Sequence, residues 1–164
     1  MNAYDLCQRN VVTVRRHEEL ATAAWMMRER NVGCLVVVDP AGAHGGWRPV
    51  GLLTDRDIVT NVFARDCDPR SVVVDEVMAR QPVTVSARTS IEEAMQRMRN
   101  AAVRRAPVVD ERGCLTGLLA LGHIFEYLAQ RAPSAVTPIR PDVRFEQPLR
   151  AAVNQPGNMG VERI

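Results

Sequence analysis

An internal repeat constrains this chain more than any other feature of its sequence. Residues 11–39 align with residues 82–110 at an offset of 71 without a gap, and ten of the 29 aligned positions are identical. Chance would give about two identities at ordinary residue frequencies. After this block the offset becomes 66, and Gly51-Leu52-Leu53 then matches Gly117-Leu118-Leu119. The chain therefore contains two copies of one folding unit, and the first copy carries a longer loop around residues 41–47.

Both copies show the same order of predicted elements. Apolar residues recur at helical spacing from Leu20 to Met27 and again from Ile91 to Met98. Each predicted helix is followed by an apolar run that is typical of a buried strand, and then by a glycine-containing turn and a second strand. The expected strands are residues 12–14, 35–38 and 50–53 in the first copy and 83–85, 106–109 and 115–119 in the second. With closing helices at 55–64 and 121–130, each copy has the order β-α-β-β-α.

One copy of about 55 residues is too small to bury both faces of its own strands and helices. We therefore expect an α/β (α+β) fold in which the two repeats pack against each other with pseudo-twofold symmetry. The predicted division is repeat one at 1–64, a linker at 65–73 and repeat two at 74–130. Residues 131–164 contain five prolines and no apolar periodicity, and they predict an extended or disordered tail.

The composition and charge of the chain disfavour several classes of function. The net charge of +2 is too small to indicate nucleic-acid or membrane binding. The absence of an 18-residue apolar run and of a secretory signal favours a cytoplasmic protein with reduced cysteines. The scattered histidines and cysteines predict no metal site. All 21 basic residues are arginine, which has two interpretations: codon usage, or the bidentate recognition of phosphate that arginine favours.

The strings that recur in the two copies resemble a known family. The segment Asp5-Leu6-Cys7 has its counterpart in Asp75 to Met78, and both precede a V-T-V strand. The strings V-G-C-L-V-V-V-D, V-R-R-A-P-V-V-D and G-L-L-T-D-R-D-I complete the pattern. Over about residues 3–130 the chain resembles the tandem CBS domain pair, or Bateman module, and is similar to bacterial stand-alone CBS-pair proteins associated with hypoxia and stress.

The resemblance implies a regulatory function. Members of the family bind adenine nucleotides or related adenosyl compounds in the cleft between the repeats, and many associate further into a disc-shaped dimer. For this chain the resemblance implies a non-catalytic module that senses AMP, ADP, ATP or a relative, requires no cofactor, forms a homodimer through its helices and acts on an unidentified protein effector.

Thr54, Asp55 and Asp57 form the first candidate site. One interpretation is structural, because a threonine N-cap followed by aspartate at the third helical position is good capping chemistry. The other is functional, because a helix start with a hydroxyl and a carboxylate suits a phosphate and a ribose. In the family the matching threonine contacts phosphate and the matching aspartate holds the ribose.

The second repeat lacks these groups, since Ala120 and His123 stand where Thr54 and Asp57 stand in the first. A hydrogen bond to a charged group contributes about 1.5–3 kcal/mol, so the second half-site is expected to bind ribose weakly or not at all. The sequence predicts one good nucleotide site. His123 itself is interpreted as a helix-start residue or as a pH-responsive group.

Further candidates surround this site. Arg104 and Arg105 precede a buried strand, where family members often carry a residue that reaches phosphates. They are interpreted either as phosphate ligands or as a solvated pair. The resemblance also implies base contacts, largely through the backbone, from Thr13, Val14, Val32 and Cys34, with Gly33 beside them.

Two other functions compete with the sensor. An interaction or scaffold protein with a vestigial cleft is favoured by the lost second motif and by Gly33-Cys34. An enzyme is disfavoured, because the sequence has no phosphate-binding glycine loop and no G-x-S-x-G motif. Cys34 is the single plausible nucleophile near the cleft, and no base accompanies it.

Overall fold

The computed structural model describes residues 1–42 and 45–131, so residues 132–164 of the predicted tail and 43–44 of the long loop lie outside the described residues. The elements of the first sequence repeat are α1 (Ala3–Leu6), β1 (Thr13–Arg15), α2 (Leu20–Arg30), β2 (Cys34–Pro40), β3 (Trp47–Thr54), α3 (Asp55–Asn61) and the 3₁₀ turn η1 (Phe63–Arg65). Those of the second are α4 (Val74–Val77), β4 (Ala79–Arg80), β5 (Val85–Ser86), α5 (Ile91–Asn100), β6 (Arg105–Val109), β7 (Leu115–Ala120) and α6 (Leu121–Arg131).

The predicted α/β fold with two β-α-β-β-α repeats is confirmed, and the structure adds short elements that periodicity does not reveal. Helices α1 and α4 contain four residues each, too few for a repeating apolar pattern. They form because polar groups cap them. The amide of Asn2 donates to the Asp5 carboxylate, and the amide of Val73 donates to the Glu76 carboxylate at 2.9 Å.

The strands form two sheets with the same internal arrangement. In the first sheet the order is β1-β2-β3-β4, with β1 parallel and β3 antiparallel to β2. In the second the order is β5-β6-β7, with the same directions. Each central strand has a bulge at the matching place, between Val37 and Val38 and between Val108 and Val109. The apolar runs thus become central strands that are buried on both faces.

Helices α2 and α5 cover these sheets with the residues that the spacing predicts. Leu20, Ala23 and Met27 are buried in one core, and Ile91, Ala94 and Met98 are buried in the other. The Ser90 hydroxyl caps α5 by accepting from the amide of Glu93 at 3.2 Å. The C-cap of α2 is Asn31, whose left-handed backbone conformation is one that asparagine tolerates.

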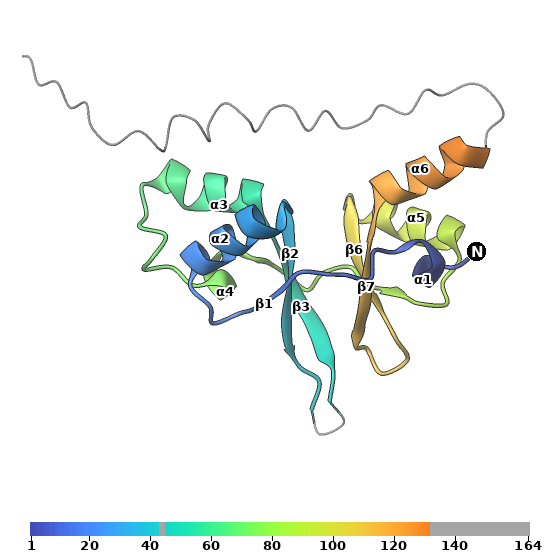
Figure 1. Cartoon of the computed structure of the whole chain (residues 1–164), viewed down its shortest axis with the longest axis horizontal. Coiled ribbons are helices and arrows are strands. Elements are labelled where there is room, and N and C mark those ends of the chain that lie inside the picture. Colours follow the sequence, from blue (N-terminus) through green and yellow to red (C-terminus); the bar gives the residue numbers. More distant parts are fainter. Residues whose placement is uncertain (43–44, 132–164) are drawn as a thin grey trace, which may run out of the picture. The chain divides into compact units, whose positions relative to one another are not determined.

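The short helix that begins each repeat, α1 or α4, packs on the sheet of the other repeat (Figure 1). Helix α1 begins the chain but packs on the second sheet, where Ala3 and Cys7 belong to the same buried cluster as Leu119 and Ile124. Helix α4 begins the second repeat but packs on the first sheet, where Val74 and Met78 join the cluster of the first repeat. The packing units are therefore divided differently from the sequence repeats.

The glycines of the repeated G-L-L string make room for this crossing. A Cβ atom on Gly51 would lie 2.4 Å from the Met78 sulfur, and one on Gly117 would lie 2.2 Å from the Cys7 sulfur. The backbone carbonyl oxygens of Ala79 and Gln8 would lie only 3.0 and 3.1 Å from these Cβ atoms, so a side chain at either position would press on the crossing segment itself. Glycine, which has no Cβ, lets the segment lie this close to the strand.

A third apolar cluster joins the two repeats. Val36 and Val38 from β2 and Leu118 from β7 are buried in it, and Leu52 and Leu115 pack against them. Full burial of one such side chain contributes about 1.5–3 kcal/mol. This shared cluster and the crossed helices hold residues Met1–Arg131 as one compact unit. Within the described ranges, no helix is long and apolar enough to cross a membrane.

Candidate ligand-binding site

The structure forms the complete capping box that the sequence predicts at Thr54. The Thr54 hydroxyl accepts from the amide of Asp57 at 3.2 Å and donates to Asp57 Oδ2 at 2.6 Å. The amide of Thr54 donates to the same carboxylate oxygen at 2.9 Å. Because the cap uses Asp57 Oδ2, the oxygen Oδ1 is the one left to accept a hydrogen bond from a ligand.

Gly33 and Asp55 form the next part of the site. The amide of Asp55 donates to the carbonyl oxygen of Gly33 at 3.3 Å. A Cβ on Gly33 would lie 2.9 Å from Asp55 Oδ2, so the carboxylate occupies the space above this glycine. The start of β2 and the start of α3 are thereby brought together where the central strands β2 and β3 end. This end of the first sheet is called the Thr54 edge below.

Cys34 lies at this edge and is paired with Thr54 across β2 and β3. Burial raises the pKa of its thiol to about 11, while the positive charge of Arg105 opposes this shift and the charges of Asp57 and Asp55 add to it. The thiol is therefore protonated at neutral pH and is a poor nucleophile. This ionisation state disfavours Cys34 as a nucleophile for covalent chemistry.

Arg105 belongs to the second repeat, and its charge acts on Cys34 of the first. This arginine is the first residue of β6, and it lies close enough to Cys34 of the other repeat to lower the pKa of the thiol. Its neighbour Arg104 is exposed, and its carbonyl oxygen accepts from the amide of Leu121 at 3.0 Å. That bond is the counterpart of the one between Asp55 and Gly33.

The predicted base-contact residues are placed differently from one another. Val14 is buried in the core of the first repeat, and Val32 packs against the same core, so their side chains face away from solvent. Thr13 is half-buried on β1, where it is paired with Val36. Any contact that Val14 makes with a ligand must therefore come from its backbone.

The second repeat has no equivalent of the Thr54 capping box. Ala120 has no hydroxyl, and the position that matches Asp55 is the half-buried Leu121. His123 Nδ1 is buried and has no hydrogen-bond partner within the described ranges. The two edges thus differ in charge, since carboxylates occupy the first and arginines with a histidine occupy the second.

A cavity of about 590 Å³ lies between the repeats, away from this edge. Four arginines line it: Arg16, Arg48, Arg80 and Arg112. Its other lining residues are Pro49, Val50, Met78, Gln81, Pro82, Thr84, Val109 and Gly113. None of the ligand-binding residues predicted from the sequence belongs to this set. No motif in the sequence indicates the cavity, because its residues come together only through the crossing of α4.

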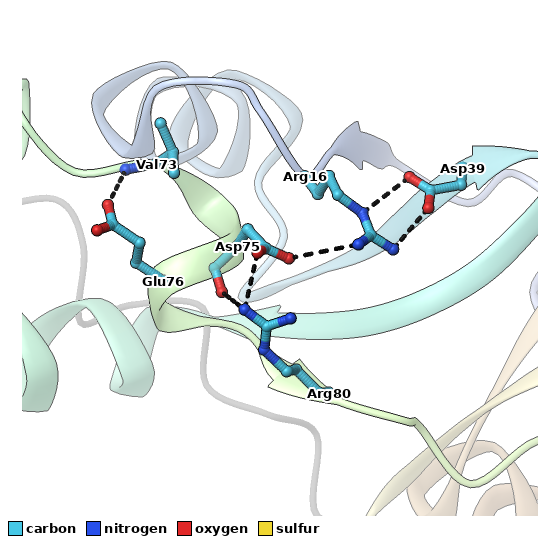
Figure 2. Close-up of polar contacts among 6 residues, drawn as sticks. All are labelled: Arg16, Asp39, Val73, Asp75, Glu76 and Arg80. Carbon is cyan, nitrogen blue, oxygen red and sulfur yellow. Dashed lines mark hydrogen bonds and ion pairs between the residues drawn. The ribbon is translucent and has the colours of Figure 1, made fainter.

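Two of these arginines belong to an ion-pair network, which Figure 2 shows. Arg16 binds the Asp39 carboxylate through two nitrogens, at 3.0 Å from Nε and 2.5 Å from Nη2, and its third nitrogen lies 3.8 Å from Asp75 Oδ1. Arg80 Nη2 donates to both the carbonyl and the Oδ2 oxygen of Asp75, at 2.9 and 2.7 Å. The network joins α4 to β1 and β2.

Comparison with known proteins identifies the class that this fold and these edges define. The CBS domain family model matches residues 3–64 and 74–130. The chain therefore belongs to the CBS domain family and is a tandem CBS pair. The sequence-based resemblance to this family is confirmed.

The particular relatives include Hypoxic response protein 1 of Mycobacterium tuberculosis, which is 34% identical over 131 residues, or 79% of this chain and 87% of that protein. Its crystal structure, with two coordinated zinc ions, has a TM-score of 0.65 at 33% identity and covers 77% of this chain and 98% of that chain. Among the described residues of this chain, no three His, Cys, Asp or Glu side chains converge on a metal position.

Two further solved structures are similar. A hexameric CBS-CP12 protein from bloom-forming cyanobacteria has a TM-score of 0.67 at 28% identity and covers 83% of this chain and 77% of that chain. CBSX2 in complex with AMP has a TM-score of 0.66 at 26% identity and covers 79% and 97% of the two chains. The chain spans only 60% of another relative, an uncharacterised protein of Methanopyrus kandleri that is 29% identical over 122 residues.

Proposed function

We propose that this protein is a non-catalytic regulatory module that binds an adenosine-containing ligand, such as AMP, ADP or ATP, and passes the change to a partner protein. The observation that carries the proposal is the Thr54–Asp57 capping box with its unused carboxylate oxygen. Arg105 of the other repeat lies near the same edge, close enough to act on Cys34. The AMP complex of CBSX2 supports the choice of ligand.

In this proposal each residue has a role that its position allows. Asp57 Oδ1 accepts a ribose hydroxyl, and Arg105 favours the phosphate. The Thr54 hydroxyl donates its proton to Asp57 Oδ2 and so holds this carboxylate in place. Arg104 adds positive charge at the rim, while Thr13, Val14, Val32, Gly33 and Cys34 offer backbone groups and a small surface to the base. Asp55, which fills the space above Gly33, limits how deeply the ligand enters.

The experiment is a calorimetric titration of AMP, ADP and ATP into the wild-type protein and into Asp57→Asn. Asparagine keeps an acceptor for the helix cap but loses the charge that strengthens a bond to ribose. Loss of a charge-assisted hydrogen bond lowers affinity by roughly 10- to 150-fold. The matched control is His123→Asn, which changes the equivalent position in the other repeat and is expected to leave binding unchanged.

Equal binding by wild type and Asp57→Asn would remove Asp57 from the ligand site. Absence of binding by every nucleotide, from protein shown to be ligand-free, would favour the second candidate function. That candidate is a scaffold protein with a vestigial cleft, and the loss of the capping box in the second repeat is the observation that favours it.

Homodimer formation through the helices is a further part of the proposal. Trp25 on α2, Phe63 on η1 and Phe125 on α6 are 62%, 66% and 60% exposed, and Val59 and Leu128 add apolar surface on α3 and α6. Met26, the next residue on α2, packs against the core of the first repeat and is not part of this surface. Trp25→Glu is expected to convert a dimer to a monomer in sedimentation. Unchanged sedimentation would move the interface away from α2.

A further inference from the structure

We infer that the cavity lined by Arg16, Arg48, Arg80 and Arg112 is a separate binding site for an oligophosphate, either inorganic or carried by a nucleotide. Four arginines line one cavity, and no acidic side chain lines it in the described part of the chain. Arginine binds phosphate bidentately and stays charged at any physiological pH. Like charges around a shared space repel one another, and a multiply charged anion relieves that repulsion.

The arginines come from four different segments. Arg16 follows β1, Arg48 lies on β3, Arg80 ends β4 and Arg112 lies in the turn between β6 and β7. Three of these segments pack on the first sheet and the fourth belongs to the second sheet. An anion in this cavity would therefore contact both repeats at once.

Two of the four guanidinium groups are held in position. The Asp39 and Asp75 carboxylates bind Arg16 and Arg80 and neutralise part of their charge (Figure 2). Within the described ranges, Arg80 uses one nitrogen in these bonds and keeps its other donors for a ligand. Arg48 and Arg112 have no ion pair among the described residues, and they supply most of the uncompensated charge.

This cavity is distinct from the Thr54 edge. Val50, which lines the cavity, is four residues before Thr54 on β3. At roughly 3.3 Å per residue the two positions are about 13 Å apart along the strand. The volume of about 590 Å³ falls in the range of small-molecule pockets. Its apolar lining, which includes Met78 and Val109, leaves space for an organic group attached to the phosphates.

The test is a titration of sodium tripolyphosphate into the full-length protein and into the double variant Arg48→Gln/Arg112→Gln. Both arginines are exposed, so their substitution leaves the core intact. Each lost charge-assisted contact weakens binding by roughly 10-fold or more, and the double variant is expected to bind about 100-fold more weakly. The charge-matched control is Arg28→Gln/Arg30→Gln on α2, which is expected to retain binding.

The same experiment separates this site from the proposed nucleotide site. Asp57→Asn should bind tripolyphosphate as wild type does, whatever it does to AMP. A titration of ATP into Asp57→Asn, which lacks the proposed ribose contact at the Thr54 edge, identifies the source of the phosphates. Tighter binding of ATP than of tripolyphosphate by this variant indicates a nucleotide, and equal or weaker binding indicates an inorganic oligophosphate. The inference is overturned if wild type does not bind tripolyphosphate, or if the Arg48/Arg112 variant binds it as well as the Arg28/Arg30 variant does.

Discussion

The two repeats of this chain share a scaffold and differ in the chemistry at its edge. Both have a parallel strand pair, a bulge at the same place in the central strand and a glycine under the crossing segment. At the edge, however, Thr54 and Asp57 form a capping box in the first repeat, and Ala120 and His123 cannot. The positions that determine packing are therefore alike in the two repeats, and the polar positions at the edge differ.

The largest effect is expected where the repeats are alike. Leu53 and Leu119 occupy equivalent positions and are both fully buried. Truncation of either to alanine should lower the free energy of unfolding by about 2–5 kcal/mol. Urea denaturation of the two variants measures this, and the comparison predicts similar losses. A loss confined to one variant would mean that the two cores contribute unequally to stability.

The stability of the first repeat is expected to depend on pH through the thiol of Cys34. The second repeat has no thiol at the equivalent position, which is Arg105. The ordinary pKa of the thiol is 9.0, and burial raises it to about 11 in the folded protein. Above pH 9 the unfolded chain loses this proton while the folded chain keeps it, so stability falls as pH rises from 9 to 11. The loss approaches about 2.7 kcal/mol, at 1.36 kcal/mol per pKa unit.

Denaturation at pH 8 and pH 10.5 measures this loss, and Cys34→Ala should remove most of it. The exposed Cys67 supplies an internal comparison, because it should react with a thiol reagent much faster than Cys34 does. Equal reactivity of the two thiols would contradict the burial of Cys34.

The difference between the two repeats at this edge can be removed by deleting the capping box from the first repeat or by installing one in the second. Thr54→Ala should destabilise the protein by about 1 kcal/mol, because the amide of Asp57 loses its acceptor. The double change Ala120→Thr/His123→Asp installs the box in the second repeat and should stabilise α6 by a similar amount. Thermal melting of both variants tests this. No gain from the installed box would mean that the backbone at Ala120 does not adopt the cap geometry.

The smallest effect is expected on the outer helix surfaces. Helix α5 carries an ion pair between Glu93 and Arg97 at 2.6 Å, and the matching positions of α2 are Thr22 and Met26. Arg97→Gln should lower the free energy of unfolding by about 0.3–0.5 kcal/mol at low salt and by less at high salt. Arg99→Gln is the control on the same helix. A cost that does not change with salt would show that the pair is not electrostatic.

The fold was predictable because its signals are local and occur twice. The spacing of Leu20 to Met27 and the apolar run before Asp39 each define an element, and their recurrence confirms the assignment. The capping box at Thr54 was predictable for the same reason, since it lies within four consecutive residues.

The arginine cavity was not predictable from the sequence. Arg16, Arg48, Arg80 and Arg112 are far apart along the chain, and Arg80 alone among them has an arginine, Arg9, at a repeat offset. Their proximity depends on α4 packing against the repeat to which it does not belong in sequence. The use of arginine for every basic residue is the one sequence feature that indicated anion binding. Composition does not show where in the fold these arginines lie.

The exchange of α1 and α4 has a consequence for what this unit can be in isolation. A single copy cut from the chain would carry a helix that fits its neighbour and would leave its own core uncovered. Two such copies could complete each other only as an interlocked dimer whose stability depends on concentration. Joining them through residues 65–73 makes the exchange intramolecular and raises the effective concentration of each helix at its partner to the millimolar range. Tandem duplication therefore turns an assembly step into a folding step.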